Sequence, residues 1–280
     1  FDNALFGVSK PEAIAMDPQH RGILEEAFTV VSDQAEREIH TAVAIGIQHL
    51  EYGALFANSI QPSPFTATGS ALSVCAGRVS YAFGFIKPSI CVDTACSSSL
   101  TTIHLMLEED SSREYMCGGV NYILGKRNCD AVRVAGMLAP DGRCKVFDAT
   151  ADGYGRSEAV SMFRFGRSNP DAPVAFVVCA SACGQDGRSA SLTAPSGTQQ
   201  HAVIQAAHRS TRHRFPVRTI SLHGTGTALG DPIECSALMD AVDGSTLREM
   251  TFLASKSSGG HAEAAAGSLA VAHAAAHLAL

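Results

Sequence analysis

Short apolar runs alternate with longer segments of helical periodicity along most of this 280-residue chain. Runs such as TAVAIGI (residues 41–47) and SICVD (residues 89–93) are apolar almost throughout, rather than at every second position. Strands of that kind are typical of a sheet that helices cover on both faces. The alternation therefore predicts an α/β fold in which helices bury the sheets.

The same patterns indicate where each element is expected. Pro18 suits the first turn of a helix, and apolar residues follow it at helical spacing. Helices are predicted over residues 11–30, 70–84, 97–110, 199–208 and the alanine-rich stretch 262–280. Strands are predicted over residues 41–47, 89–93, 115–124, 159–165, 173–183, 217–222 and 250–255.

The composition limits the class of protein. Hydrophobic residues make up 46% of the chain and charged residues 17%, which predicts a folded protein with an apolar core. The net charge of −6 and the lack of a lysine and arginine block argue against nucleic-acid binding. Nine cysteines at irregular spacing, without a C-x-x-C pair, indicate a reduced, cytoplasmic protein. The alanine-rich stretch carries Glu263 and two histidines, so a buried core helix is predicted there rather than a membrane span.

Cys96 lies where an apolar strand is expected to turn into a helix, within VDTACSSSL (residues 92–100). Small neighbouring side chains would let a substrate approach the sulfur closely. A helix N-terminus stabilises a thiolate, and its backbone N–H groups stabilise a developing oxyanion. Cys96 is therefore the leading nucleophile candidate. The local sequence is equally typical of a buried core cysteine, which behaves as a small hydrophobe.

Two histidines also follow predicted strands. His223 opens HGTGTALGDPIE, and His261 lies in KSSGGHAEAAAG, where Lys256 and Glu263 flank it. Glycines beside each histidine leave room for a ligand, and the flanking charges would tune the pKa of His261. Each motif alone is also typical of an ordinary hydrogen-bonded histidine or of a capping loop.

Other catalytic patterns are disfavoured. The pair His273 and His277 is one helical turn apart, but no third zinc ligand or H-E-x-x-H signature accompanies it. No G-x-S-x-G motif occurs, which disfavours a serine hydrolase. The glycines after His223 do not have the spacing of a dinucleotide-binding fingerprint. No metal site is predicted.

Taken together and in this order, the three motifs around Cys96, His223 and His261 resemble the β-ketoacyl synthase (ketosynthase) family, especially the type in modular and iterative polyketide synthases. Similar stretches fill the intervals, so the resemblance covers nearly the whole chain. It implies a thiolase-like fold with α-β-α-β-α layers and two related halves, at about residues 1–168 and 169–280.

The resemblance also implies a Cys-His-His site. An acyl group would pass from the phosphopantetheine of an acyl carrier protein to Cys96. A malonyl or methylmalonyl thioester would then lose carbon dioxide, with His223 and His261 stabilising the enolate that attacks the Cys96 thioester. By the same resemblance Lys256 and Glu263 support the His261 site, and Thr225 and Thr227 line the pantetheine entry. The resemblance implies no bound cofactor, and a homodimer when the domain is complete.

Compared with the family, the sequence is expected to be truncated at both ends, because an N-terminal strand region and the segment G-F-G-G-T-N-A-H are absent. One alternative is therefore a catalytically incompetent fragment that binds a synthase or a carrier protein. Another is a thiolase-type acyltransferase acting on coenzyme A esters, which the two-histidine pattern disfavours. A purely structural protein would not explain three reactive residues at three strand ends.

Overall fold

The computed structural model describes residues 1–32, 39–55, 62–109, 112, 114–166, 174–211, 216–242 and 249–279. The chain divides into two compact units. The first comprises residues 1–129, 157–172 and 262–269, and the second comprises residues 130–156, 173–261 and 270–280. Both units combine helices with strands, which confirms the predicted α/β class.

The first unit contains a four-stranded sheet with strand order β2-β1-β3-β4. Its strands are β1 (Thr41–Gly46), β2 (Ser89–Val92), β3 (Glu114–Asn121) and β4 (Ala159–Gly166). Strand β1 pairs in parallel with β2 and β3, and β4 is antiparallel to β3. Every residue of β1 is buried, as its almost wholly apolar sequence predicts.

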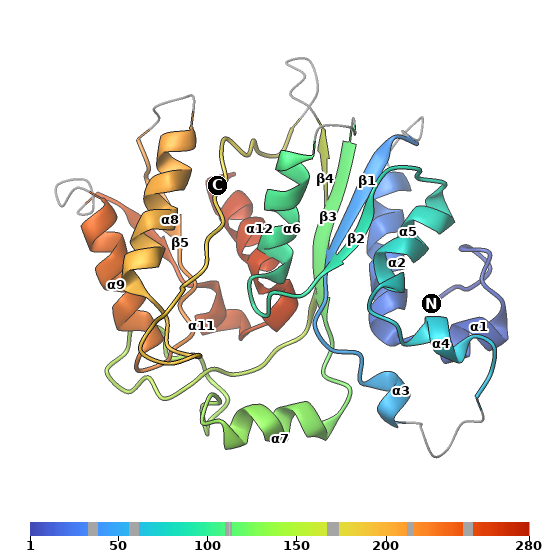
Figure 1. The fold of residues 1–280 in the computed structure, drawn as a ribbon, viewed down its shortest axis with the longest axis horizontal. Helices are drawn as coiled ribbons and strands as arrows, with labels where there is room; N and C mark the ends of the chain where they lie inside the picture. Colours follow the sequence, from blue (N-terminus) through green and yellow to red (C-terminus); the bar gives the residue numbers. More distant parts are fainter. Residues whose placement is uncertain are drawn as a thin grey trace. The chain divides into compact units, whose positions relative to one another are not determined.

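Helices cover both faces of this sheet (Figure 1). Helices α2 and α5 pack on one face, and α6 packs on the other together with the short helix η1. Their bounds are α2 (Pro18–Ser32), α5 (Val74–Phe83), α6 (Ser98–Glu108) and η1 (Glu263–Ala265). Three short helices complete this part of the chain: α1 (Lys10–Ala15), α3 (Tyr52–Leu55) and α4 (Thr66–Gly69). The apolar core lies between the sheet and the α2–α5 layer.

Gly46 lets α6 approach the end of β1. A Cβ atom at this position would lie 2.5 Å from the backbone nitrogen of Ser99. Because backbone cannot move aside as a flexible side chain can, Gly46→Ala is expected to lower the free energy of unfolding by about 1–3 kcal/mol. Gly77→Ala on α5 is the matched control, since no atom lies within 4 Å of its added Cβ. It is expected to raise stability by about 0.5–1 kcal/mol, because alanine favours a helix. Equal urea midpoints for the two variants would contradict this account of the packing.

His20 on α2 is a second determinant of stability. It is 1% exposed, and neither ring nitrogen has a hydrogen-bond partner among the described residues. Burial, and to a lesser extent the charge of Arg78, lowers the pKa of His20 to about 3. Below pH 6.5 the unfolded chain therefore binds a proton that the native state does not, and stability falls by about 1.4 kcal/mol per pH unit.

Between pH 7 and pH 5 the wild type is expected to lose about 2 kcal/mol of stability through protonation of His20 in the unfolded chain. The variant His20→Gln cannot take up this proton and is therefore expected to be spared this loss. Urea unfolding at the two pH values measures the difference. The same loss in both proteins would show that His20 does not carry the linkage.

The second unit contains the parallel pair β5 (Thr219–Ser221) and β6 (Thr251–Leu253). Helices α8 (Gly197–Ser210) and α9 (Gly230–Ala241) pack against each other, and the short α11 (Ser255–Gly259) follows β6. These elements confirm the helix and the two strands predicted within residues 199–255. The strand-end positions of His223 and His261 follow from this order.

Helices α7 (Lys126–Val134) and α12 (Ala266–Leu278) each have residues in both units. Of the helix predicted over residues 262–280, the buried residues that the structure describes all lie at its start, up to Ser268, whereas Leu278 is 70% exposed. An alanine methyl offers little apolar area, so burying the later turns would gain little free energy. None of the described helices is long and apolar enough to cross a membrane.

Two predicted elements differ in the structure. The helix over residues 11–30 is two helices, α1 and α2, because Asp17 precedes Pro18 and a residue before proline disfavours helical backbone. The strand predicted over residues 173–183 is wrong: residues 174–183 form no strand. Val174 and Val177 are each 64% exposed there, because none of the described strands pairs with the segment.

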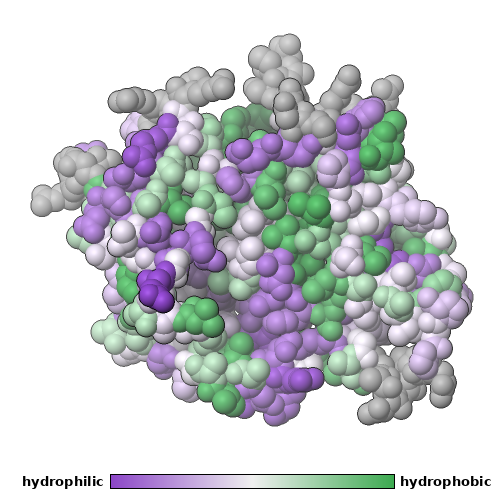
Figure 2. Space-filling model, in the orientation of Figure 1, coloured by the Kyte–Doolittle hydropathy of each residue, from purple (hydrophilic) through white to green (hydrophobic). Residues whose placement is uncertain are grey.

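Apolar side chains also gather on the solvent side of α6 (Figure 2). Leu100, Leu105 and Leu107 are 50%, 39% and 41% exposed. On the same helix Ile103 and Met106 are buried. Helix α6 is therefore apolar on both faces, which is why its sequence alone does not show which face meets the core.

Candidate active site

Cys96 lies in a tight turn between β2 and α6. The preceding residue, Ala95, has a φ angle of 55°, a left-handed conformation that non-glycine residues seldom adopt. The turn is secured by its neighbours: the Asp93 carboxylate accepts the Ala95 N–H at 3.0 Å, and the Ser98 hydroxyl accepts the Thr94 N–H at 2.9 Å. Strained backbone that its surroundings enforce is typical of functional positions.

Helix α6 begins at Ser98, so Cys96 precedes an eleven-residue helix by two positions. The side chain of Cys96 is half-buried. Hydroxyl groups surround the turn: Ser97 donates to Thr94, whose own Oγ1 lies 3.1 Å from that of Thr101. This confirms the predicted strand-to-helix junction, where the positive end of the helix dipole favours an anion.

The two histidines lie together in the second unit. The ring centroids of His223 and His261 are 5.6 Å apart, with the ring planes at 88°. The His261 ring also packs on Tyr154, at 4.9 Å between centroids, and its backbone N–H donates to the Gly155 carbonyl at 2.7 Å. Two separate motifs of the sequence therefore form one pair of imidazoles.

Both imidazoles are neutral at neutral pH. Burial, and then the positive charge of Lys256, lowers the pKa of His261 to about 2. The same two causes lower the pKa of His223 to about 4. His261 is 3% exposed, whereas His223 is exposed, and the charges of His223 and Arg156 lower the pKa of His261 further. A neutral imidazole carries one N–H, which can donate to a developing oxyanion.

Lys256 is a buried positioning residue for His223. Its Nζ donates to the His223 backbone carbonyl at 2.5 Å, and its side chain is 5% exposed. Glu234 acts on the other side of the same residue, accepting the N–H groups of His223 at 2.6 Å and Gly224 at 2.8 Å. These two charged groups therefore position His223 through its backbone rather than through its ring.

Asp231 organises the rest of this loop. It is 3% exposed at the start of α9, and its carboxylate accepts the N–H groups of Thr225 and Gly226, each at 3.1 Å. It also accepts the N–H of Phe147 at 2.9 Å, from a distant loop. Neither Asp231 nor Glu234 was among the residues predicted from sequence. The available signal was the pair of acidic residues just after a glycine-rich loop with many backbone donors.

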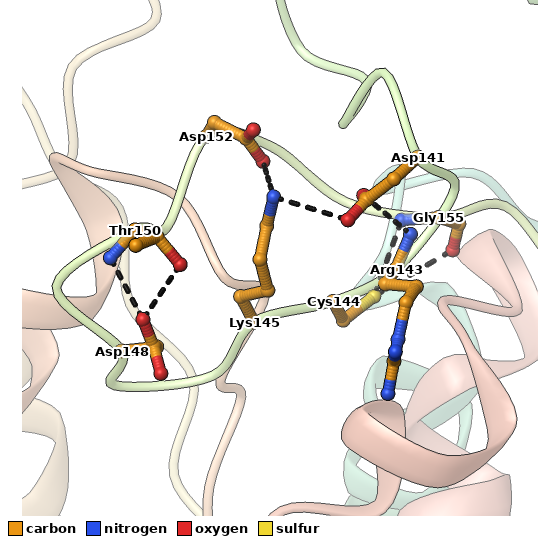
Figure 3. A network of polar contacts seen from close by, with 8 residues as sticks. All are labelled: Asp141, Arg143, Cys144, Lys145, Asp148, Thr150, Asp152 and Gly155. Carbon is orange, nitrogen blue, oxygen red and sulfur yellow. Dashed lines mark hydrogen bonds and ion pairs between the residues drawn. The ribbon is translucent and has the colours of Figure 1, made fainter.

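The loop of residues 137–156 stabilises the second unit through local polar contacts (Figure 3). Lys145 Nζ bridges two carboxylates, at 3.3 Å from Asp141 and 2.6 Å from Asp152. Asp148 accepts both the backbone N–H and the hydroxyl of Thr150, at 2.8 and 2.7 Å. These bonds define the shape of the loop at its exposed side.

At its buried side the same loop reaches both histidine motifs. The Cys144 sulfur accepts the Gly155 N–H at 3.3 Å (Figure 3), and the Gly155 carbonyl accepts the N–H of His261. A Cβ atom at Gly226, whose φ is 76°, would lie 2.6 Å from the backbone nitrogen of Lys145. The loop therefore packs on the glycine-rich turn and positions His261. Sequence reasoning assigned it no role.

The other predicted site residues are placed as follows. Thr225 and Thr227 lie in the turn after His223, with their hydroxyls 3.1 Å apart. Glu263 belongs to η1 in the first unit, is 7% exposed, and has a left-handed φ of 42°. Cys96 also belongs to the first unit, whereas His223 and His261 belong to the second. The catalytic roles of these residues stay predictions.

Two family models match the chain. The N-terminal domain of beta-ketoacyl synthases matches residues 1–167, and the C-terminal domain matches residues 175–279. Among curated proteins, a phenolphthiocerol/phthiocerol polyketide synthase of Mycobacterium tuberculosis is 36% identical over 284 residues, covering 95% of this chain and 13% of that protein. Erythronolide synthase EryA3 of Saccharopolyspora erythraea is 38% identical over 284 residues, covering 95% of this chain and 9% of that protein.

Solved structures give the same result. The ketosynthase from module 6 of the bacillaene synthase of Bacillus subtilis 168 superposes with a TM-score of 0.88 at 30% identity, covering 99% of this chain and 51% of that one. The oxazolomycin ketosynthase domain of Streptomyces albus JA3453 gives a TM-score of 0.89 at 30% identity, with 99% and 52% covered. The chain thus spans about half of these ketosynthases, and their likeness confirms the predicted thiolase-like fold. The chain belongs to the β-ketoacyl synthase family.

Proposed function

We propose that this protein is a β-ketoacyl synthase domain of polyketide or fatty acid biosynthesis, which joins an acyl group to a malonyl-type extender. The observation that carries the proposal is the Cys96 turn, where strained backbone presents a thiol at the start of α6. The pair of neutral histidines in the second unit supports it. We assign the two family halves to residues 1–168 and 169–280.

In the first step the Cys96 thiolate attacks the carbonyl carbon of an acyl thioester on the phosphopantetheine of a carrier protein. The C–S bond to Cys96 forms, the bond to the pantetheine sulfur breaks, and that sulfur leaves as a thiolate that takes up a proton. Backbone N–H groups at the start of α6 are suited to the oxyanion of the tetrahedral intermediate. Thr225 and Thr227 would line the entry of the pantetheine arm.

In the second step a malonyl or methylmalonyl thioester loses carbon dioxide, and the electrons of the broken C–C bond form an enolate. The N–H groups of His223 and His261 donate to the enolate oxygen. The enolate carbon then attacks the Cys96 thioester and releases the Cys96 thiolate. Each neutral imidazole carries one N–H, so each ring can donate one hydrogen bond to the enolate oxygen.

Lys256 and Glu234 serve as positioning residues, since they bind the backbone around His223 rather than a substrate. Lys256 and Glu263 would support the His261 site. The partners we propose are an acyl carrier protein and a malonyl-type thioester, with a homodimer as the assembly. The chemistry requires no metal or redox cofactor, and a cytoplasmic location stays a prediction.

Intact-protein mass spectrometry tests the first step. Wild-type protein incubated with an acyl pantetheine thioester is expected to gain the mass of one acyl group, and Cys96→Ala is expected to gain none. Cys235→Ser, which changes a thiol on α9, is the matched control and should still be acylated. Folded wild-type protein that takes up no acyl group would favour the alternative of a ketosynthase-like binding fragment.

A further inference from the structure

Two cysteines that the proposed reaction does not use face each other in the first unit. Cys75 lies in the first turn of α5 and is fully buried, whereas Cys91 lies on β2 and is half-buried. The Cys75 and Cys91 side chains are close enough to shift each other's pKa, and Cys91 also accepts the backbone N–H of Ala76, the residue that follows Cys75. Helix α5 packs on β2, so the two thiols are brought together by the layers of the fold and not by a loose loop.

The two sulfurs have different surroundings, because backbone N–H groups donate to Cys91. The Cys91 sulfur accepts the backbone N–H of Ala76 at 3.2 Å, and a further backbone N–H bond comes from Cys75. These donors stand at the N-terminus of the ten-residue helix α5, which favours negative charge on the sulfur.

The charge states follow from the same contacts. The hydrogen bond from the Cys75 thiol, and then the backbone donors, lower the pKa of Cys91 despite its partial burial. The same thiol–thiol bond, and then burial, raises the pKa of Cys75. Cys91 is thus the sulfur that loses its proton more readily, and Cys75 is the partner that keeps its proton. Cys117, a buried thiol on β3, shows the contrast, since burial alone raises its pKa.

We propose that Cys75 and Cys91 form a two-thiol oxidation site, in which Cys91 reacts with hydrogen peroxide and Cys75 then closes a disulfide. In the first step the Cys91 thiolate attacks one peroxide oxygen, the O–O bond breaks, and the leaving hydroxide takes a proton to give water and Cys91 sulfenic acid. In the second step the Cys75 sulfur displaces the sulfenic hydroxyl, which leaves as water with the Cys75 proton. The pair loses two electrons, and peroxide is reduced to two waters.

Peptide mapping after peroxide treatment tests this proposal. Arg78 lies between the two cysteines, so trypsin separates them unless a disulfide joins the fragments. The Cys96→Ala protein, which removes the competing nucleophile, is expected to yield the fragment of Cys75 linked to that of Cys91. Cys91→Ser should yield no such link. Cys75→Ser should instead accumulate Cys91 sulfenic acid, which dimedone captures. Cys235→Ser combined with Cys96→Ala is the control, and its Cys75 and Cys91 fragments should still be linked.

Circular dichroism establishes that each variant is folded, and fragmentation of the linked peptide from wild-type protein distinguishes Cys91 from Cys96 if Cys96→Ala does not fold. A folded protein whose other cysteines become oxidised while Cys75 and Cys91 stay unlinked would overturn the proposal. A folded Cys75→Ser protein in which dimedone captures no sulfenic acid at Cys91 would overturn it as well. The test is independent of the proposed condensation, because it requires no acyl substrate.

Discussion

Replacing Asp231 with alanine is expected to lower the free energy of unfolding by about 3–5 kcal/mol, since the change leaves several buried backbone donors without an acceptor. The carboxylate accepts N–H groups from Thr225 and Gly226 and from Phe147 in the loop of residues 137–156. Its side chain is 3% exposed, so water cannot readily replace it. The loss should therefore loosen both the glycine-rich turn and the loop that positions His261.

Asp240→Ala is the matched control, because Asp240 is exposed on the same helix α9. Its effect is expected to stay within about 0.5 kcal/mol. Urea denaturation of the two variants and the wild type measures the difference. If Asp231→Ala were no less stable than Asp240→Ala, the backbone contacts of Asp231 would not be the support that we describe.

Replacing His261 with alanine is expected to slow decarboxylation of a malonyl thioester by about 10²–10³-fold, which is the usual cost of one lost oxyanion donor. Transfer of an acyl group to Cys96 should survive, because that step does not use this imidazole. His261→Asn, which keeps an N–H donor, should recover part of the rate. Release of carbon dioxide measures the effect, with acylation as the parallel readout.

The pH dependence provides a second test of the same pair. Because the pKa values of His223 and His261 lie at about 4 and about 2, neither ring should take up a proton between pH 7.5 and pH 5.5. Decarboxylation should therefore show no loss with an apparent pKa near 6.5 in that range. Such a loss, absent from His261→Asn, would contradict the assignment of a neutral imidazole.

Much of the first unit was predictable from the sequence. The almost wholly apolar run of β1 predicts a strand buried on both faces, and the strand-to-helix junction at Cys96 follows from VDTACSSSL. Both features depend on consecutive residues, so a short stretch of sequence is enough to predict them. The pairing of His223 with His261 came only from the resemblance, since the two residues lie 38 positions apart with no local pattern that joins them.

The sequence was misleading or silent where contacts with distant parts of the chain determine the local structure. The apolar run of residues 174–183 has strand composition, yet a strand forms only when another strand offers a ladder. The roles of Asp231 and Cys144 depend on backbone N–H groups from distant parts of the chain. The sequence alone does not show which backbone N–H group a given carboxylate or thiol will contact.

The central claim is that Cys96 and the two histidines carry out a decarboxylative condensation. Mass spectrometry of the products formed from an acyl and a malonyl pantetheine thioester tests it most directly. The account predicts a β-ketoacyl thioester two carbons longer than the acyl substrate, formed by the wild type and absent with Cys96→Ala. Folded wild-type protein that takes up the acyl group on Cys96 and yet yields no longer product would contradict it.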